Sequence, residues 1–535
     1  MKTEKTSFIL FKEMTRLKLL TSLLTLFPRL LFDLDDPVGV SEVFPPRLRR
    51  SYDFIVVGSG SAGAVVAARL SEARGVSVLL LEAGGDGTLL SLVPAGVGAT
   101  LNTALDWQYR TRPDPARASC LGMFGGSCLW HAGRVLGGGS SINGMLYVRG
   151  DQADYNAWER AGNPGWGWES VLAYFKKSER QTNARYAEDT RHHGTAGPLS
   201  VSDLRYRTPL SSAFVRAGAG AGLPVRDLNT GNSTGVTVMQ TMMRAGKRHS
   251  AATAFLKPVL GRPNLTVLTH ALVEKILFVK TKDGRVRADQ VIFTRFGEKM
   301  KMRATKEIIV SAGVVETPKL LLLSGIGPRQ QLENLGIPVT ADLPVGENMQ
   351  SHVGTGDVVF TLNAPVSFNP LRLFTNPLNL LAYWRGEGPL AAVSGFEGMA
   401  LYRSGLDADA AWPDIQLNLI SLTPAIDGGL VYRRSLNLND QTYEKYKPLA
   451  FQEGFFILPV LLHPKSRGQV SLRSRDPADP PIIDPNYLSH PLDLARLVRA
   501  VRFSQQLGTS SHFRQYGAQF YSRPISQVCC RIMQR

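Results

Sequence analysis

The pattern of apolar and polar positions changes abruptly near Arg50. Residues 52–57 form a short apolar run that ends at a glycine, and residues 76–81 form a second such run. Runs of this length are typical of strands that are buried on both faces of a parallel sheet. Between them, residues 61–74 carry an Ala/Val/Leu face at helical spacing. Strand, glycine turn, helix and strand together predict one βαβ unit.

Further elements are expected along the rest of the chain. Residues 264–280 predict strands, and residues 307–312 predict a strand that leads into a leucine-rich helix. The other expected elements are an aromatic helical region at 158–175, loops and helices at 365–390, a strand and turn at 458–472 and a helix at 491–506.

The N-terminal 50 residues differ from the rest of the chain. Scattered Lys and Arg residues precede an apolar run at residues 19–27. This run is far shorter than the about 20 residues that a membrane-spanning helix needs, and a basic stretch before a short apolar run is typical of a secretory signal. We therefore expect residues 1–50 to be a leader, either a signal or an anchor, with an amphipathic leader as the alternative. This predicts a secreted or extracellular protein, or else a membrane-associated one.

Composition and charge narrow the class of protein. At 535 residues the chain exceeds the roughly 250–300 at which single cores stop growing, so two or more modules are expected. Hydrophobic residues at 44% and charged residues at 20% fit a soluble α/β enzyme and exclude disorder and collagen. The net charge is +17, but Lys and Arg are scattered without aromatic platforms. We expect a basic solvated surface and no nucleic-acid partner.

The chain has four cysteines, which are too few for a disulfide scaffold and lack paired CxxC spacing, so no metal site is predicted. Cys120 and Cys128 can close a loop if the compartment is oxidising, a pairing that the sequence leaves open. Cys529 and Cys530 lie in a short polar tail and are expected to be free.

The strongest local motif is Gly58-Ser-Gly60-Ser61-Ala-Gly63, between the first strand and its helix. The first glycine permits a tight turn, the second lets a pyrophosphate approach the backbone, and the third lets helix and strand pack closely. The helix N-terminus offers unpaired N–H groups to phosphate. Glu82 ends the second strand about 20 residues further on, where a carboxylate can bind ribose hydroxyls. The motif predicts a dinucleotide site and leaves NAD and FAD open.

A second glycine-rich loop spans residues 133–144 and is followed by Met145-Leu146-Tyr147. Closely spaced glycines and hydroxyl residues let backbone N–H groups approach another part of an extended cofactor. Taken alone, this string is equally typical of a flexible surface loop.

The resemblance to a known family becomes specific here. Residues 133–156 resemble the first signature of the glucose-methanol-choline (GMC) oxidoreductases, and residues 311–328 resemble the second, with Val314 where a small residue is usual. Residues 246–258, 264–273, 464–468 and 485–487 are also similar to stretches of that family, so the resemblance runs from about Tyr52 to Leu507.

The resemblance implies a fold class and a division of the chain. The fold is α/β (α+β overall), with a Rossmann-like FAD/NAD(P)-binding domain and a second substrate domain built on an antiparallel sheet. The implied ranges are 51–350 for a discontinuous FAD-binding region, 351–450 for a substrate-domain segment and 451–535 for a truncated C-terminal region.

The resemblance also implies an activity. Members are FAD-dependent oxidoreductases that pass a hydride from the CH–OH group of an alcohol or sugar to flavin N5, while a histidine takes the hydroxyl proton. The electron acceptor is a quinone or oxygen. Ile142 stands near the place where some relatives carry a covalently bound histidine, so non-covalent FAD is expected. The expected cofactor contacts are Gly58, Gly60, Ser61, Gly63, Glu82, Val135, Gly138, Ser140, Asn143, Gly144, Met145, Leu146 and Val273.

One departure from the family pattern concerns catalysis. The HPxGTxxMG-like stretch that carries the family's histidine does not occur in the sequence, so this histidine is expected beyond Arg535. Losing a positioned base costs a factor of about 10² to 10⁴ in rate, so we expect catalysis by these residues to be incomplete. His131, just before the second loop, is the candidate replacement. The alternatives are a non-catalytic flavin-binding protein or truncated isoform, and an NAD-linked dehydrogenase, which the two long signatures disfavour.

Overall fold

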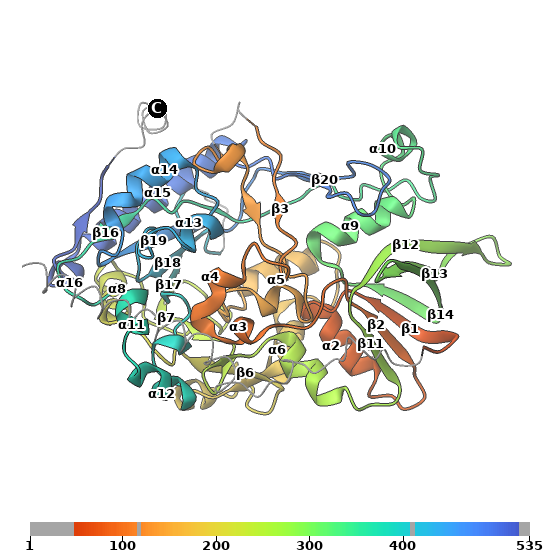
Figure 1. The fold of residues 1–535 in the computed structure, drawn as a ribbon, viewed down its shortest axis with the longest axis horizontal. Coiled ribbons are helices and arrows are strands. Elements are labelled where there is room, and N and C mark those ends of the chain that lie inside the picture. Colours follow the sequence, from red (N-terminus) through yellow and green to blue (C-terminus); the bar gives the residue numbers. More distant parts are fainter. Residues whose placement is uncertain (1–47, 115–118, 407–411, 524–535) are drawn as a thin grey trace, which may run out of the picture.

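The computed structural model describes residues 48–114, 119–406 and 412–523 (Figure 1). Most of the predicted leader, both C-terminal cysteines and Arg535 lie outside these residues. Two sheets occupy opposite sides of the molecule, one at the right and one at the left of Figure 1. Among the described residues, no helix combines the length and the apolar character that crossing a membrane requires.

The first sheet has six strands in the order β11-β2-β1-β14-β13-β12. The first four of these strands are parallel, and β12 and β13 continue the sheet as an antiparallel extension. Helix α2 (Ser61–Leu70) connects β1 to β2, so the predicted βαβ unit is confirmed. The strands are β1 (Ser51–Val57), β2 (Val78–Leu81), β11 (Leu265–Leu268), β12 (Ala271–Lys280), β13 (Val286–Arg295) and β14 (Glu298–Val310).

The two faces of this sheet are both covered, which explains the unbroken apolar runs in β1 and β2. Successive side chains of a strand point to opposite faces. One set packs against the alanine face of α2 and against the π-helical turn η4 (Ala252–Leu256), and the other packs with the β12–β13 hairpin and α9 (Gly313–Leu323). The first set is Val56, Val78 and Leu80, and the second is Ile55, Val57, Leu79 and Leu81.

The second sheet has seven strands, and its strand pairs are all antiparallel among the described residues, which confirms the predicted fold class. Helices α8 (Pro209–Gly220) and α15 (Pro491–Gly508) pack on one face through Phe214 and Leu507. The strands are β7 (Gly235–Val238), β15 (Val353–Gly354), β16 (Val359–Thr361), β17 (Phe396–Tyr402), β18 (Ile415–Ile420), β19 (Gly454–Leu461) and β22 (Gln519–Phe520). Strand β7 comes from within residues 51–350, and the division of the chain into ranges stays a prediction.

Shorter elements make up the rest of the described fold. The helices are α3 (Leu89–Leu92), α4 (Val97–Thr100), α5 (Gln152–Arg160), α6 (Trp168–Ser178), α7 (Ala184–Ala187), α10 (Arg329–Asn334), α11 (Pro370–Phe374), α12 (Leu378–Trp384), α13 (Tyr432–Ser435), α14 (Asp440–Tyr446) and α16 (Ser511–Arg514). The 3₁₀ turns are η1 (Pro94–Gly96), η2 (Phe124–Gly126), η3 (Gly138–Ser141), η5 (Lys257–Val259), η6 (Pro389–Ala391) and η7 (Lys447–Leu449). The strands are β3 (Tyr109–Arg110), β4 (Leu129–Trp130), β5 (Glu179–Gln181), β6 (Leu199–Asp203), β8 (Gln240–Thr241), β9 (Met243–Arg244), β10 (Lys247–Arg248), β20 (Gln469–Ser471) and β21 (Ile482–Asp484).

Two local features refine the predictions made from the sequence. Helix α2 ends at Leu70 rather than near residue 74, because the side chains of Arg262 and Asn264 bind backbone carbonyls at its C-terminus. Cys120 and Cys128 form a disulfide, so the pairing that the sequence left open is present in the structure. It closes the loop just before β4 and the second glycine-rich loop.

Candidate cofactor site

The first glycine-rich loop joins β1 to α2, and two of its glycines are required by packing. Gly58 has φ +91°, and a Cβ there would lie 2.7 Å from the carbonyl oxygen of Ser311. A Cβ on Gly63 would lie 1.9 Å from the carbonyl oxygen of Gly58. These two glycines therefore serve the turn and the helix–strand contact, as the motif predicted.

Gly60 is different, because the protein does not fill the space beside it. A Cβ on Gly60 would have the Ser311 carbonyl oxygen, 4.0 Å away, as its nearest neighbour. Gly60 is also the N-cap of α2, which has no side-chain cap and no acidic residue in its first turn. The first N–H groups of a helix lack intrahelical partners and favour an anion. The loop thus presents a backbone without a side chain, together with unpaired N–H donors, to the open space beside Gly60.

The second glycine-rich loop packs directly on the first. The N–H of Gly137 donates to the carbonyl of Ser59 (2.7 Å), and a Cβ on Gly138 would lie 2.7 Å from Cα of Gly60. Gly139 resembles Gly60, since no atom would lie within 4 Å of a Cβ there. The two predicted loops therefore converge, and both have glycines that face open space, since a Cβ on Gly144 would also have no atom closer than 4.0 Å.

The start of the second signature lies at the same place. The N–H of Ser311 donates to the carbonyl of Val57 (2.8 Å), and its hydroxyl lies 3.0 Å from the carbonyl oxygens of Val57 and Gly58. Ser311 comes directly after β14, which pairs in parallel with β1. Three segments that are remote in sequence thus meet at the carboxyl edge of the parallel strands, where ligands bind in open α/β sheets.

Glu82 lies at the end of β2, beside the first loop. Its carboxylate accepts hydrogen bonds from the N–H groups of Ser59 and Gly84, both at 2.9 Å. Burial raises the pKa of Glu82 to about 7, although both N–H groups oppose this shift. A carboxylate has about four acceptor positions, so two bonds leave capacity for ribose hydroxyls. The predicted role of Glu82 is compatible with this geometry.

Val273, the other expected contact of the adenine half, lies on β12. The N–H groups of His270 and Ala271, just before it, donate to the carbonyls of Gly84 and Glu82 (both 2.8 Å). The start of β12 therefore lies beside the end of β2. The adenine contact of Val273 itself stays a prediction.

The residues after η3 lead from the second loop to the antiparallel sheet. Oδ1 of Asn143 accepts a hydrogen bond from the N–H of Met145 (3.0 Å), which has φ +56°. The carbonyl of Met145 accepts from the N–H of Met242, and the N–H of Tyr147 donates to the carbonyl of Gln240 (2.9 Å). These bonds hold the predicted flavin-side segment at β8.

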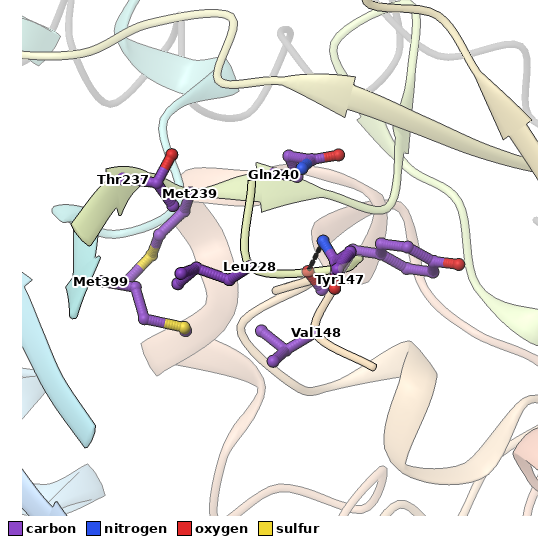
Figure 2. Close-up of a pocket in the computed structure, with 8 residues that line it drawn as sticks. Tyr147, Val148, Leu228, Thr237, Met239, Gln240 and Met399 are labelled. Atoms are coloured by element: carbon purple, nitrogen blue, oxygen red, sulfur yellow. Dashed lines mark hydrogen bonds between the residues drawn. The ribbon is translucent and has the colours of Figure 1, made fainter. Parts of the chain in front are cut away.

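A small pocket lies where this segment meets the sheet. Figure 2 shows Leu228, Met239 and Met399 on one side of it and Tyr147 and Val148 on the other. The lining is mostly apolar, and three of these residues are buried in one cluster. The pocket marks the packing contact between the two halves of the molecule.

Both ring nitrogens of His131, the candidate base, lie within hydrogen-bonding distance of other residues. Its Nδ1 lies 2.7 Å from the carboxylate of Asp106, and its Nε2 lies 3.0 Å from the carbonyl oxygen of Ser435. Both partners are acceptors, so a ring that makes both bonds has no lone pair left to take a proton. Burial alone would raise the pKa of Asp106, but the hydrogen bonds from His131 and backbone N–H groups lower it below its usual value. This geometry favours a structural role for His131, and its catalytic role stays a prediction.

The sequence did not reveal a buried charge network behind the flavin-side segment. Glu179 accepts from Arg149 (2.8 Å) and bonds to Nδ1 of His193 (3.0 Å), and Nε2 of His193 lies 2.6 Å from Asp227. Burial alone would lower the pKa of His193, but its bonds to Asp227 and Glu179 raise it to about 9. These four residues are separated by 30, 14 and 34 positions in the sequence, so no local pattern signals them. In the described part of the chain, no cluster of His, Cys, Asp and Glu has the geometry of a metal site.

Comparison with known proteins gives consistent matches. Two models described as GMC oxidoreductase match residues 52–354 and 464–528. The chain is 38% identical to glucose dehydrogenase (FAD, quinone) from Drosophila pseudoobscura pseudoobscura, over 93% of this chain and 77% of that protein. It is 35% identical to alcohol dehydrogenase (acceptor) from Pseudomonas putida, over 87% and 80%. The crystal structure of pyridoxine 4-oxidase from Mesorbium loti superposes with a TM-score of 0.73 at 29% identity, covering 90% of this chain and 85% of that one.

These matches bear on the C-terminal region, which the sequence predicts to be truncated. The C-terminal family model also matches, over residues 464–528 of this chain. The described residues end at Arg523, so the segment up to Arg535 has no structural account. The expectation that the family's histidine lies beyond Arg535 is therefore neither confirmed nor contradicted, and it stays a prediction. The role of His131 as a replacement also stays a prediction, and its two hydrogen bonds argue against it.

Proposed function

The chain belongs to the GMC oxidoreductase family, and from this premise we propose that it is an FAD-dependent dehydrogenase that oxidises an alcohol or a sugar and passes the electrons to a quinone. Membership makes it an FAD-dependent oxidoreductase of small-molecule donors with a quinone or oxygen as acceptor. The preference for a sugar or alcohol and for a quinone is supported by the names of the relatives. The observation that carries the proposal is the convergence of the two glycine loops with Gly60 and Gly139 facing open space.

The residues present fit FAD. The uncapped N-terminus of α2 and the bare backbone at Gly60 suit the pyrophosphate, and Glu82 beside them suits the ribose. The second loop, from Gly138 to Asn143, is placed to hold the flavin half. When bound, FAD supplies a two-electron acceptor for hydride. The contribution of the chain is to hold the phosphates, to orient the ring through the second loop and to keep the loops fixed by their mutual hydrogen bonds.

A second candidate function is flavin binding without catalysis. The observation that favours it is His131, whose two ring nitrogens are both bonded to acceptors. This candidate shares the cofactor site with the first and differs only in turnover.

The cofactor and the two candidates are tested by one set of spectra. We expect the purified protein to show flavin absorbance, and acid precipitation to leave FAD in the supernatant, since Ile142 offers no nucleophile for a covalent bond. Anaerobic addition of glucose, simple alcohols or choline should bleach the flavin, and a quinone should restore it faster than oxygen does. A colourless protein would refute FAD binding. Coloured protein that no donor bleaches would support the non-catalytic candidate.

A secreted location is also part of the proposal. Stable disulfides form in oxidising compartments, and the Cys120–Cys128 bond supports such a location. Membrane association through the N-terminal residues is the alternative. Expression of the full chain in secretory cells, followed by assay of medium, membranes and cytosol, distinguishes these cases. Recovery of the protein from the cytosol with Cys120 and Cys128 reduced would contradict both the secreted and the membrane-associated location.

A further inference from the structure

The sequence contains two triplets of the form that accepts N-linked oligosaccharides in secreted proteins. They are Asn232-Ser-Thr234 and Asn264-Leu-Thr266. Each has an asparagine, a middle residue other than proline, and a hydroxyl residue two positions after the asparagine. The sequence alone does not distinguish a glycan acceptor from an ordinary asparagine. The structure places the two asparagines in opposite environments.

Asn232 lies in a loop just before strand β7 and is exposed. Within the described ranges, no hydrogen bond engages its side chain. The residues on either side of it are held in place. The N–H of Gln152 donates to the carbonyl of Gly231 (2.8 Å). The N–H and the hydroxyl of Ser233 donate to the carboxylate of Asp151 (3.1 and 2.8 Å). The loop backbone is therefore fixed, while the amide of Asn232 stays accessible from solvent.

The side chain of Asn264 is instead part of the fold. Its Nδ2 donates to three backbone carbonyls, those of Ser71 and Ala73 (both 3.1 Å) and Val76 (2.8 Å). These bonds hold the turn between α2 and β2. The amide has two N–H groups, and a sugar bonded to Nδ2 would remove one of them and displace this turn. A glycan on Asn264 is therefore incompatible with the fold.

We propose that Asn232 carries an N-linked oligosaccharide and that Asn264 does not. The inference rests on the proposed secreted location, which the Cys120–Cys128 disulfide also supports. The co-reactant is a lipid-linked oligosaccharide. Nδ2 of Asn232 loses one proton and forms a bond to the anomeric carbon of the sugar. The bond from that carbon to the lipid pyrophosphate breaks, and the pyrophosphate leaves with the electron pair.

The test uses the full chain, expressed in eukaryotic secretory cells. Digestion with peptide N-glycosidase converts each glycosylated asparagine to an acid, so mass spectrometry of the peptides distinguishes the two sites. We expect conversion at Asn232 and none at Asn264. The digestion should also shift the protein on a gel, and Asn232→Gln or Thr234→Ala should abolish this shift. The matched control Thr234→Ser keeps the triplet and should retain the shift.

The oxidation state of Cys120 and Cys128 is measured on the same material, because it shows whether the chain entered an oxidising compartment. Reduced cysteines together with an absent glycan would refute the secreted location and the glycan with it. An intact disulfide with an unmodified Asn232 would overturn the glycan proposal alone. A glycan on Asn264 of the folded protein would overturn it as well.

The contrast between the two asparagines is tested separately in a host without N-glycosylation. Asn232→Asp and Asn264→Asp make the same chemical change, but only Asn264→Asp loses three hydrogen bonds and places a carboxylate beside carbonyl oxygens. We expect Asn264→Asp to lower the Tm by a few degrees and Asn232→Asp to leave it unchanged. Equal Tm values for the two variants would contradict the environments on which the proposal depends.

Discussion

The substitution Gly60→Ala tests whether Gly60 is required for cofactor binding rather than for folding. The backbone of Gly60 has φ −72°, which any residue adopts, and a Cβ there would meet no protein atom closer than 4.0 Å. The new methyl group would instead occupy the space in front of the α2 N-terminus. We therefore expect the variant to fold normally and to bind FAD poorly.

The magnitudes follow from the same geometry. Replacing glycine by alanine at an accessible conformation stabilises by about 0.4–1 kcal/mol, and alanine is a poorer N-cap than glycine by a similar amount. The two effects nearly cancel, so the Tm of the apoprotein should stay within a few degrees of wild type. A hydrogen bond to a charged phosphate contributes about 1.5–3 kcal/mol. Losing one of them weakens binding by roughly 10- to 150-fold.

Gly63→Ala is the matched control in the same loop. A Cβ on Gly63 would lie 1.9 Å from the carbonyl oxygen of Gly58, so helix and strand must separate. Overpacking of this kind costs about 1–3 kcal/mol or more. We expect the apoprotein of this variant to lose several degrees of Tm before any cofactor is added.

Thermal melts of both apoproteins and fluorescence titration with FAD are sufficient to decide. If Gly60→Ala binds FAD as tightly as wild type, the pyrophosphate does not approach this backbone and the assignment of the loop is wrong. If the apoprotein of Gly60→Ala melts as early as that of Gly63→Ala, the glycine is a packing requirement and says nothing about a ligand.

Three other variants test the structure away from the loops. Two buried carboxylates raise the pKa of His193 to about 9. Its contribution to stability is therefore complete below its unfolded pKa of about 6.5 and is lost as pH rises through about 9, so the Tm of wild type should fall over that window. A His193→Gln variant whose Tm changes with pH as steeply as that of wild type would contradict this. Replacing Cys120 and Cys128 by serine opens a loop of sequence separation 8 and should cost about 2–3 kcal/mol in the free energy of unfolding, and an unchanged urea midpoint would show that the bridge adds nothing. His131→Gln should leave the rate of flavin bleaching within about twofold and lower the stability by about 1–3 kcal/mol, and a rate loss of about 10² would restore His131 as the base.

Local signals predicted the core of the first sheet and the cofactor loops. The apolar runs of β1 and β2 and the spacing of Gly58, Gly60 and Gly63 lie within one βαβ unit, so neighbouring residues carry the information. The antiparallel extension of the sheet and the end of α2 at Leu70 depend on contacts with Arg262 and beyond, which no local window contains.

Contacts between distant segments explain what the sequence did not reveal. His131 was a candidate because it precedes the second loop, but its function is decided by Asp106 and Ser435, and the latter is 304 residues away. Asn264 was one residue in a stretch similar to the family, and only the structure shows that its amide binds three carbonyls at the end of α2. A side chain's partners across the fold determine its chemistry more than its neighbours in sequence do.

The pairing of β1 with β14 sets the order in which the newly made chain can fold. Val57 and Ser311, which meet beside the first loop, are 254 residues apart. Translation proceeds at about 5–20 residues per second, so β1 and β2 leave the ribosome tens of seconds before β14 completes the centre of their sheet. During that interval their apolar faces lack the strand beside them and the helix that covers one side. Transiently exposed apolar strands are prone to aggregate, so slowing synthesis after residue 81 should increase aggregation during translation.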